Sequence, residues 1–382
     1  MKALTNLSAP RRVNLGDVGS AGFHIGCGAA AHPAFHRMGD AIARACQRLW
    51  ALPICGILCP MNTLISIVQS DFGNDDVERP VITSRGFECR WHNAQTTEAI
   101  IAAGQGAAGI LAEWVDITDE ILAAWPECRV VCRYGVGYDN VDHEAAARRG
   151  IAVMNVPDYC PDEVAEHAIA LMFSVSRSIV RNNDEVRRGE WRSSFSGFRA
   201  LTGKTFGIVG FGRIGKATAR RAAGLDMRVM AYDINPVPLP GLDVTFTNSL
   251  EELLPQADVL SLHVPLTPLT RRMIDASKLA LMKRDAILVN TARGPVVVQQ
   301  DLADALMQGR LAGAGLDVHE VEPLPMDAPI RQCPNVVLTS HMAFYSPDSL
   351  IRMRSWTAQN AVDFLSGIDN GRIVNGVRPG AR

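Results

Sequence analysis

The chain has 382 residues, more than one typical hydrophobic core accommodates, which favours two domains. Its formal net charge of −2 leaves no basic footprint, so no nucleic-acid partner is expected. The longest apolar run, residues 49–59, is too short to cross a bilayer, so no membrane insertion is expected. Nine cysteines, an odd number without disulfide-like or zinc-like spacing, predict reduced thiols, a cytoplasmic location and no metal site.

Residues 1–60 differ from the rest of the chain, being rich in Ala, Gly, His and Arg without clear periodicity. Three interpretations stay open: a disordered or loosely helical extension, an Arg-rich targeting segment, or sequence upstream of a true start at Met61. An extension outside the fold is preferred. From Met61 onward the pattern becomes regular enough to open a domain.

Short apolar segments then alternate with helical ones up to residue 157. The expected strands are residues 64–69, 88–91, 108–110, 130–132 and 152–155, and helices are expected at 97–103 and 119–125. This alternation predicts an α/β fold with a parallel sheet. Apolar residues at helical spacing then predict one long helix over 162–188 that links two domains. A last helix is expected at residues 348–365.

The stretch TFGIVGFGRIGKATARRAAGLDMRVMAYD, residues 205–233, reads as strand, glycine turn, helix and second strand. Gly210, Gly212 and Gly215 fall at the spacing G-x-G-x-x-G where the helix must begin. The first glycine allows a tight turn, the second lets a pyrophosphate approach the backbone, and the third lets the helix pack on the sheet. The anion would lie at the helix N-terminus. A dinucleotide site is therefore predicted.

Asp233 follows the second strand of this unit, where an acidic residue is expected to bind the adenosine ribose hydroxyls. A carboxylate there repels a 2′-phosphate, and residues 234–236 offer no Arg to neutralise one. The predicted cofactor is NAD rather than NADP.

With GFGRIG followed by VNTARGP, LDVHEVEP and SHMAFYS, the chain resembles the D-isomer-specific 2-hydroxyacid dehydrogenases from Met61 to Val377. RYGVGYDNVD, NVPDYCPDEVAEHA and LTSHMAFYS look most like the branch that contains the C-terminal binding proteins. The resemblance implies two Rossmann-like domains, with an NAD-binding domain (163–341) inserted in a flavodoxin-like substrate domain (61–162 and 342–382). It also implies a homodimer that uses residues 162–188 and the loop around Trp191.

Interconverting a 2-hydroxy acid and a 2-keto acid requires a cation for the carboxylate, a proton-transfer group and a nearby nicotinamide. Arg293 follows an expected strand, residues 286–289, and matches the family's catalytic arginine. His341 is the predicted general acid/base, and Glu322 would hydrogen-bond its far ring nitrogen. The resemblance thus implies a catalytic set of Arg293, Glu322 and His341.

Gly135, Val136 and Gly137 are predicted to offer backbone N–H groups to the substrate carboxylate, and Arg133 to face the same site. Further cofactor contacts come from the loops that the resemblance matches, with His263 shaping its loop rather than transferring protons. The predicted cofactor-binding residues, beside the three glycines and Asp233, are Arg213, Ile214, His263, Val264, Pro265, Thr270, Thr291, Ala292 and Asp317.

The predicted function is that of an NAD-dependent oxidoreductase acting on the CH–OH group of a small 2-hydroxy acid. One alternative is D-3-phosphoglycerate dehydrogenase, against which Glu113 and Trp114 stand where a phosphate would need a basic residue. The other is an NAD(H)-sensing corepressor or scaffold like the C-terminal binding proteins. Ser340 and Phe344 depart from the residues usual in relatives and affect the shape of the pocket.

Overall fold

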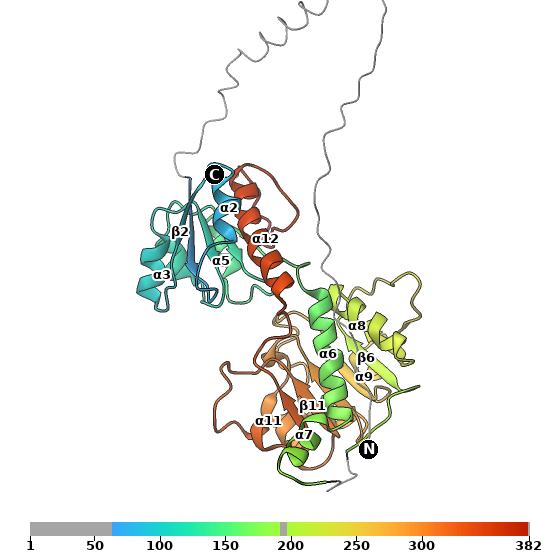
Figure 1. Ribbon diagram of the computed structural model, residues 1–382. Helices are drawn as coiled ribbons and strands as arrows, with labels where there is room; N and C mark the ends of the chain where they lie inside the picture. Colours follow the sequence, from blue (N-terminus) through green and yellow to red (C-terminus); the bar gives the residue numbers. More distant parts are fainter. Residues whose placement is uncertain (1–62, 192–196, 381–382) are drawn as a thin grey trace, which may run out of the picture. The chain divides into compact units, whose positions relative to one another are not determined.

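The computed structural model describes residues 63–191 and 197–380 (Figure 1). The predictions made for residues 1–60 lie outside this range. Within it, strands and helices alternate and form two sheets in which every strand pairing is parallel. The predicted α/β class with two Rossmann-like sheets is therefore confirmed. No helix among the described residues is both long and apolar enough to span a membrane.

The first sheet has five strands in the order β2-β1-β3-β4-β5. Its strands are β1 (Leu64–Gln69), β2 (Glu88–Trp91), β3 (Gly109–Ala112), β4 (Val130–Arg133) and β5 (Ala152–Met154). The helices between them are α2 (Glu78–Thr83), α3 (Thr97–Gly104), α4 (Asp119–Ala123) and α5 (His143–Arg148). Strands β1, β3, β4 and β5 are buried along their whole length, as expected for parallel strands covered on both faces.

The last helix, α12 (Pro347–Leu365), packs on this first sheet although some 180 residues of the second sheet intervene. Met353, Ala361 and Phe364 of α12 join the buried cluster that also contains Ile65 and Val130. Figure 1 shows α12 beside α2. A Ser346 capping box begins the helix, with Pro at its first position.

The second sheet has seven strands in the order β12-β11-β10-β9-β6-β7-β8. Its strands are β6 (Thr205–Val209), β7 (Arg228–Tyr232), β8 (Thr245–Phe246), β9 (Val259–Leu262), β10 (Ile287–Asn290), β11 (Gly313–Leu316) and β12 (Val336–Leu338). Its helices are α6 (Pro161–Ser176), α7 (Ile179–Arg187), α8 (Arg213–Gly224), α9 (Leu250–Leu253), α10 (Ala276–Leu281) and α11 (Gln299–Met307), with short 3₁₀ turns η1 (Gly294–Val296) and η2 (Pro329–Gln332).

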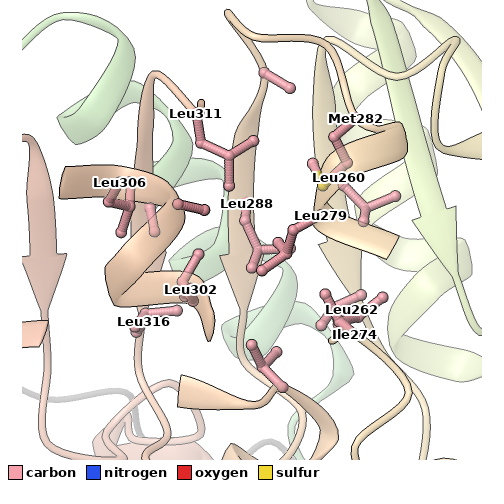
Figure 2. Packing of buried hydrophobic residues seen from close by; sticks show 14 of the residues in the cluster. Leu260, Leu262, Ile274, Leu279, Met282, Leu288, Leu302, Leu306, Leu311 and Leu316 are labelled. Carbon is pink, nitrogen blue, oxygen red and sulfur yellow. The ribbon is translucent and has the colours of Figure 1, made fainter. Parts of the chain in front are cut away.

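Alternate residues of the second sheet enter two different cores, because successive strand side chains point to opposite faces. Leu288 of β10 packs with Leu302 and Leu306 of α11 (Figure 2), whereas its neighbours Ile287 and Val289 pack with helix α6 and helix α8. The sheet is thus sealed on both faces, so the polar groups that matter for function are found at the ends of its strands.

The single helix predicted for residues 162–188 is wrong: α6 ends at Ser176 and α7 starts at Ile179. Ser178 between them has φ 47° and ψ 42°, a left-handed conformation that cannot continue an α-helix. The apolar spacing that supported the prediction ends at Val175, and no residue of α7 is buried. Without an apolar face against the core, nothing holds α7 in line with α6.

Candidate functional site

The turn between β6 and α8 has the geometry that the glycine spacing predicts. Gly210 has φ 93°, and a Cβ there would lie 2.8 Å from the backbone of His263. A Cβ on Gly215 would lie 2.1 Å from the carbonyl oxygen of Gly210, so only glycine lets α8 pack this closely. Around Gly212, by contrast, no described atom lies within 4 Å of an added Cβ. The turn is therefore open at its middle glycine.

Helix α8 begins at Arg213 without a side-chain cap, so its first N–H groups are available to an anion. Arg213 itself forms an ion pair with Asp158, and Ile214 packs against the core of the first sheet. Both side chains thus bind other parts of the chain, and the anion site is formed by backbone.

Asp233 follows β7 and bonds to the backbone on both sides of it. Its Oδ2 accepts the N–H of Phe211 at 2.6 Å, and its Oδ1 accepts the N–H of Asn235 at 2.8 Å. The carboxylate thereby connects the glycine turn to the end of the second strand. Ile234, its neighbour, is exposed and brings no positive charge.

The loop after β9 carries four of the predicted cofactor residues. His263 Nε2 lies 2.9 Å from Ser261 Oγ, and burial lowers the pKa of the imidazole to about 3, so it is neutral at neutral pH. Thr270 Oγ1 donates to the carbonyl of Pro265 at 2.5 Å and fixes the loop that includes Val264. A neutral His263 agrees with a loop-shaping role.

The buried side-chain atoms without a hydrogen-bond partner among the described residues include His263 Nδ1, after β9, and Thr291 Oγ1, after β10. Buried polar atoms usually have a hydrogen-bond partner, so these two point to an absent ligand. Together with the open Gly212 and the uncapped α8, they fit a dinucleotide. Ala292, next to Thr291, donates its N–H to the buried Asn290 side chain.

Arg293 follows β10, in a turn that Asn290 shapes by bonding both Ala292 N–H and the Arg293 carbonyl. Its Nε donates to Asp139 Oδ1 at 3.0 Å. Its Nη2 would lie 1.6 Å from a Cβ on Gly137, so the guanidinium occupies the space that glycine leaves free. Neither Asp139 nor Asn290 was predicted from the sequence. Asp139 lies inside the RYGVGYDNVD motif, and that position was the signal that could have identified it.

His341 and Glu322 form the contact that the sequence predicts, with His341 Nδ1 2.7 Å from Glu322 Oε2. Glu322 Oε1 also accepts the N–H of His319 at 2.8 Å. Burial opposes ionisation of Glu322, but the hydrogen bonds from His341 and His319 outweigh it, so its pKa is lowered. The carboxylate is ionised and holds one ring nitrogen of His341, which leaves Nε2 for other partners.

Asp317 anchors the loop that carries His341. Its main-chain carbonyl accepts the His341 N–H at 2.7 Å, and its carboxylate accepts the N–H groups of Met342 and Ala343 at 3.0 and 2.9 Å. Burial opposes its ionisation, but hydrogen bonds from His167, Thr339 and this loop lower the pKa to about 2. His167 of α6 thereby helps to hold this buried carboxylate.

Trp114, which follows β3 of the first sheet, contacts site residues that belong to both sheets. Its ring meets the His341 ring edge-on at a centroid distance of 5.2 Å, and the Arg133 guanidinium carbon lies 5.5 Å from the centre of the Trp114 ring. Arg133 Nη1 would lie 1.7 Å from a Cβ on Gly135. Its guanidinium therefore occupies the space beside this glycine, as the guanidinium of Arg293 does beside Gly137. Val136, between the two glycines, accepts a hydrogen bond from Asn155 through its carbonyl at 2.6 Å.

The predicted site residues therefore gather in two groups. Glu322 and His341 touch directly, and the Trp114 ring contacts both His341 and Arg133. Arg293 lies on Gly137 of the RYGVG turn and pairs with Asp139, two residues beyond that turn. No hydrogen bond links Arg293 to His341 or Glu322 in the part of the chain that the structure describes.

A glycine turn that opens a helix on a parallel sheet, with an arginine and a carboxylate-bound histidine at strand ends, is typical of a dinucleotide-dependent oxidoreductase. A family model described as D-isomer specific 2-hydroxyacid dehydrogenase, NAD binding domain, matches residues 169–343. The chain belongs to the D-isomer specific 2-hydroxyacid dehydrogenase family. It is accordingly an NAD-binding oxidoreductase that acts on CH–OH groups.

Individual relatives support this placement. A glyoxylate reductase of Korarchaeum cryptofilum is 44% identical over 265 residues, which cover 68% of this chain and 80% of that protein. A glycerate dehydrogenase of Methylorubrum extorquens is 38% identical over 290 residues, covering 74% of this chain and 88% of the relative. The structure of a D-lactate dehydrogenase from Aquifex aeolicus, with NAD and lactic acid, matches with a TM-score of 0.74 and 29% identity, covering 82% and 98% of the two chains.

Proposed function

We propose that this protein reduces a small 2-keto acid to the D-2-hydroxy acid, and oxidises it in reverse, with Arg293, Glu322 and His341 as its catalytic residues. NADH supplies the hydride for the keto carbon when bound and leaves as NAD⁺, and one proton completes the hydroxyl group. The observation that carries the proposal is the 2.7 Å contact between His341 Nδ1 and Glu322 Oε2.

His341 gives its Nε2 proton to the keto oxygen as the C–O bond becomes single, and takes a proton back in the reverse direction. The ionised Glu322 stabilises the imidazolium before that transfer and keeps the Nδ1 proton in place after it. Arg293 binds the substrate carboxylate and the oxygen on which negative charge develops, because its planar fork offers two parallel donors.

The two sheets take different roles in this proposal. Residues 163–341 hold the dinucleotide, and residues 61–162 with 342–382 hold the substrate. Support comes from the open glycine turn on β6 and from the packing of α12 on the first sheet. Asp233, without a basic neighbour at Ile234, favours NADH over NADPH.

A protein of this kind would act in the cytosol as a homodimer. Helix α7 supports a dimer contact because none of its residues is buried and Ile179, Val180 and Val186 are exposed, as is Trp191 beyond it. Membership of the branch with the C-terminal binding proteins stays a prediction. A phosphoglycerate dehydrogenase is not favoured, because the loop after β3 carries Glu113 and Trp114 in place of a basic residue for the phosphate.

The test is an initial-rate assay of NADH oxidation with glyoxylate, hydroxypyruvate, pyruvate and oxaloacetate. The wild-type protein is expected to turn over at least one of them, and His341→Asn to lower kcat by about 10²- to 10⁴-fold. Asn at position 341 keeps a polar side chain of similar reach but cannot transfer the proton. Turnover by His341→Asn at the wild-type rate would refute the assigned acid/base.

A further inference from the structure

The guanidinium of Arg133 is buried without an ion-pair partner. The residue is only 7% exposed, its Nε has no hydrogen-bond partner, and no carboxylate of the described residues lies within salt-bridge distance of it. Burial, together with repulsion from Arg293, lowers its pKa to about 10, so it keeps its charge at neutral pH. A buried charge is costly unless something pairs with it, which points to an anion that enters from outside.

The position of Arg133 relative to the catalytic groups limits what this anion can be. Arg133 lies on Gly135 and Arg293 lies on Gly137, so the two guanidiniums flank one short turn. Arg133 also contacts the ring of Trp114, which in turn contacts the ring of His341. An anion bound by Arg133 would therefore lie beside the Trp114 ring that also contacts His341.

Nearby carboxylates do not neutralise Arg133. Asp139 is paired with Arg293 at 3.0 Å. Glu113 is buried and its Oε2 accepts the N–H of Asp71 at 2.9 Å, while burial raises its pKa to about 7, so much of it is uncharged at neutral pH. The turn therefore carries two arginine charges against one carboxylate that is fully paired. In the proposed function the carboxylate next to the keto group binds Arg293, which leaves the charge of Arg133 for a second anionic group.

We propose that Arg133 binds a second carboxylate of the substrate, so that the preferred substrates are 2-keto dicarboxylic acids. This inference rests on the proposed function, in which the carboxylate next to the keto group is bound by Arg293. The distal carboxylate then lies on Arg133 against the Trp114 ring.

The first experiment compares kcat/KM for oxaloacetate and 2-oxoglutarate with kcat/KM for pyruvate and 2-oxobutyrate, with NADH. The dicarboxylic acids are expected to be better by about 10²-fold, because pairing a desolvated charge is worth that much. Arg133→Met, which removes the charge and keeps the length, should lower their kcat/KM by about 10²-fold or more and that of the monocarboxylic acids far less. Arg85→Met, which removes an exposed arginine, is the control.

A preference for the monocarboxylic acids, or an equal loss on both classes in Arg133→Met, would overturn the inference while leaving the proposed function intact. If the wild-type protein turned over none of the 2-keto acids, the proposed function would instead be refuted. A binding measurement then decides about Arg133 independently of turnover.

That measurement is the thermal stability of the protein with NADH and D-malate or D-lactate, a combination in which no hydride transfer occurs. D-malate is expected to raise the Tm of the wild-type protein more than D-lactate does, and Arg133→Met should remove the difference. Without ligand, Arg133→Met should itself raise the Tm by roughly 2–6 °C, because an unpaired buried charge is gone. A lowered Tm together with an unchanged response to D-malate would show that Arg133 is only structural.

Discussion

Two glycine-rich turns, GFGRIG after β6 and RYGVG at the end of β4, look alike in sequence but use the space that glycine leaves free in opposite ways. At Gly212 the space is empty and faces the uncapped start of α8. At Gly135 and Gly137 it is filled by the guanidiniums of Arg133 and Arg293. The first turn leaves room for a ligand's phosphates, and the second gives room to the chain's own charges.

This difference shows what each sheet contributes. The turn on the second sheet offers backbone N–H groups, which bind any pyrophosphate equally well. The turn on the first sheet positions two guanidinium groups, which in our proposal select the acid that binds. Changes at the first turn should therefore alter cofactor binding, and changes at the second should alter the reaction and its specificity.

The largest expected effect follows from removing the cation at the second turn. Arg293→Met should lower kcat/KM for 2-keto acids by about 10³-fold, because both the carboxylate and the developing charge lose their donor. Steady-state kinetics measures the loss, with the exposed Arg271→Met as the matched control. A decrease below about tenfold would mean that the guanidinium on Gly137 does not contact the reacting group.

Exchanging one glycine for alanine in each turn sharpens the comparison. Gly137→Ala places a Cβ 1.6 Å from Arg293 Nη2, so the guanidinium must move and kcat/KM should fall by about 10²-fold. Gly212→Ala meets nothing within 4 Å, so it should leave the Tm of the ligand-free protein within about 1 °C while raising the KM for NADH roughly tenfold. If both variants changed the same kinetic constant, the two turns would not differ in role.

Asp233 gives a third and smaller effect, on the cofactor side alone. Asp233→Asn removes the charge and keeps one side-chain oxygen, which accepts the N–H of Phe211 or of Asn235 but not of both. The KM for NADH should rise several-fold and that for NADPH should fall, so that the preference for NADH shrinks by about tenfold. Paired assays with the two nucleotides measure this preference, and an unchanged ratio would contradict the role given to the carboxylate.

The smallest expected effect is on the pH dependence of the free energy of unfolding, through Glu113. Glu113 has a folded-state pKa raised to about 7 by burial, above its ordinary value of 4.5, so the folded protein binds more protons than the unfolded chain between these values. The stabilisation by its neutral form is complete below about pH 4.5 and is lost as the pH rises through 7. Relative to Glu113→Gln, the wild-type protein should therefore lose roughly 1–3 kcal/mol of unfolding free energy across this range.

Denaturant titrations of both proteins at pH 4.5, 6 and 7.5 check this prediction. Glutamine keeps an acceptor for the Asp71 N–H, so the hydrogen bond is the same in the two proteins and only the ionisation differs. Parallel curves across the pH range would show that Glu113 titrates normally.

Features encoded by local spacing were predictable from the sequence. The glycine turn, helix α8 and Asp233 lie within about thirty residues, so their geometry follows from backbone sterics and strand–helix alternation alone. The break at Ser178 was not predictable, because apolar periodicity measures which face is buried and says nothing of a left-handed residue between two helices.

The substrate side was predictable only in part. The resemblance supplied Glu322 and His341, and the structure brings them together over 19 residues of chain. The pairing of Arg293 with Asp139 joins residues 154 positions apart, and nothing local in the sequence encodes it. Gly135 and Gly137 were expected to offer N–H groups to a ligand; that they also make room for two arginines depends on side-chain directions that spacing does not give.

The account depends most on Glu322 and His341 acting as one proton-transfer unit, and a double-mutant cycle on kcat tests this directly. Glu322→Gln and His341→Asn are each expected to slow keto-acid reduction, and the double variant should be about as slow as His341→Asn alone, because the glutamate acts only through the imidazole. Losses that multiply in the double variant would contradict the account.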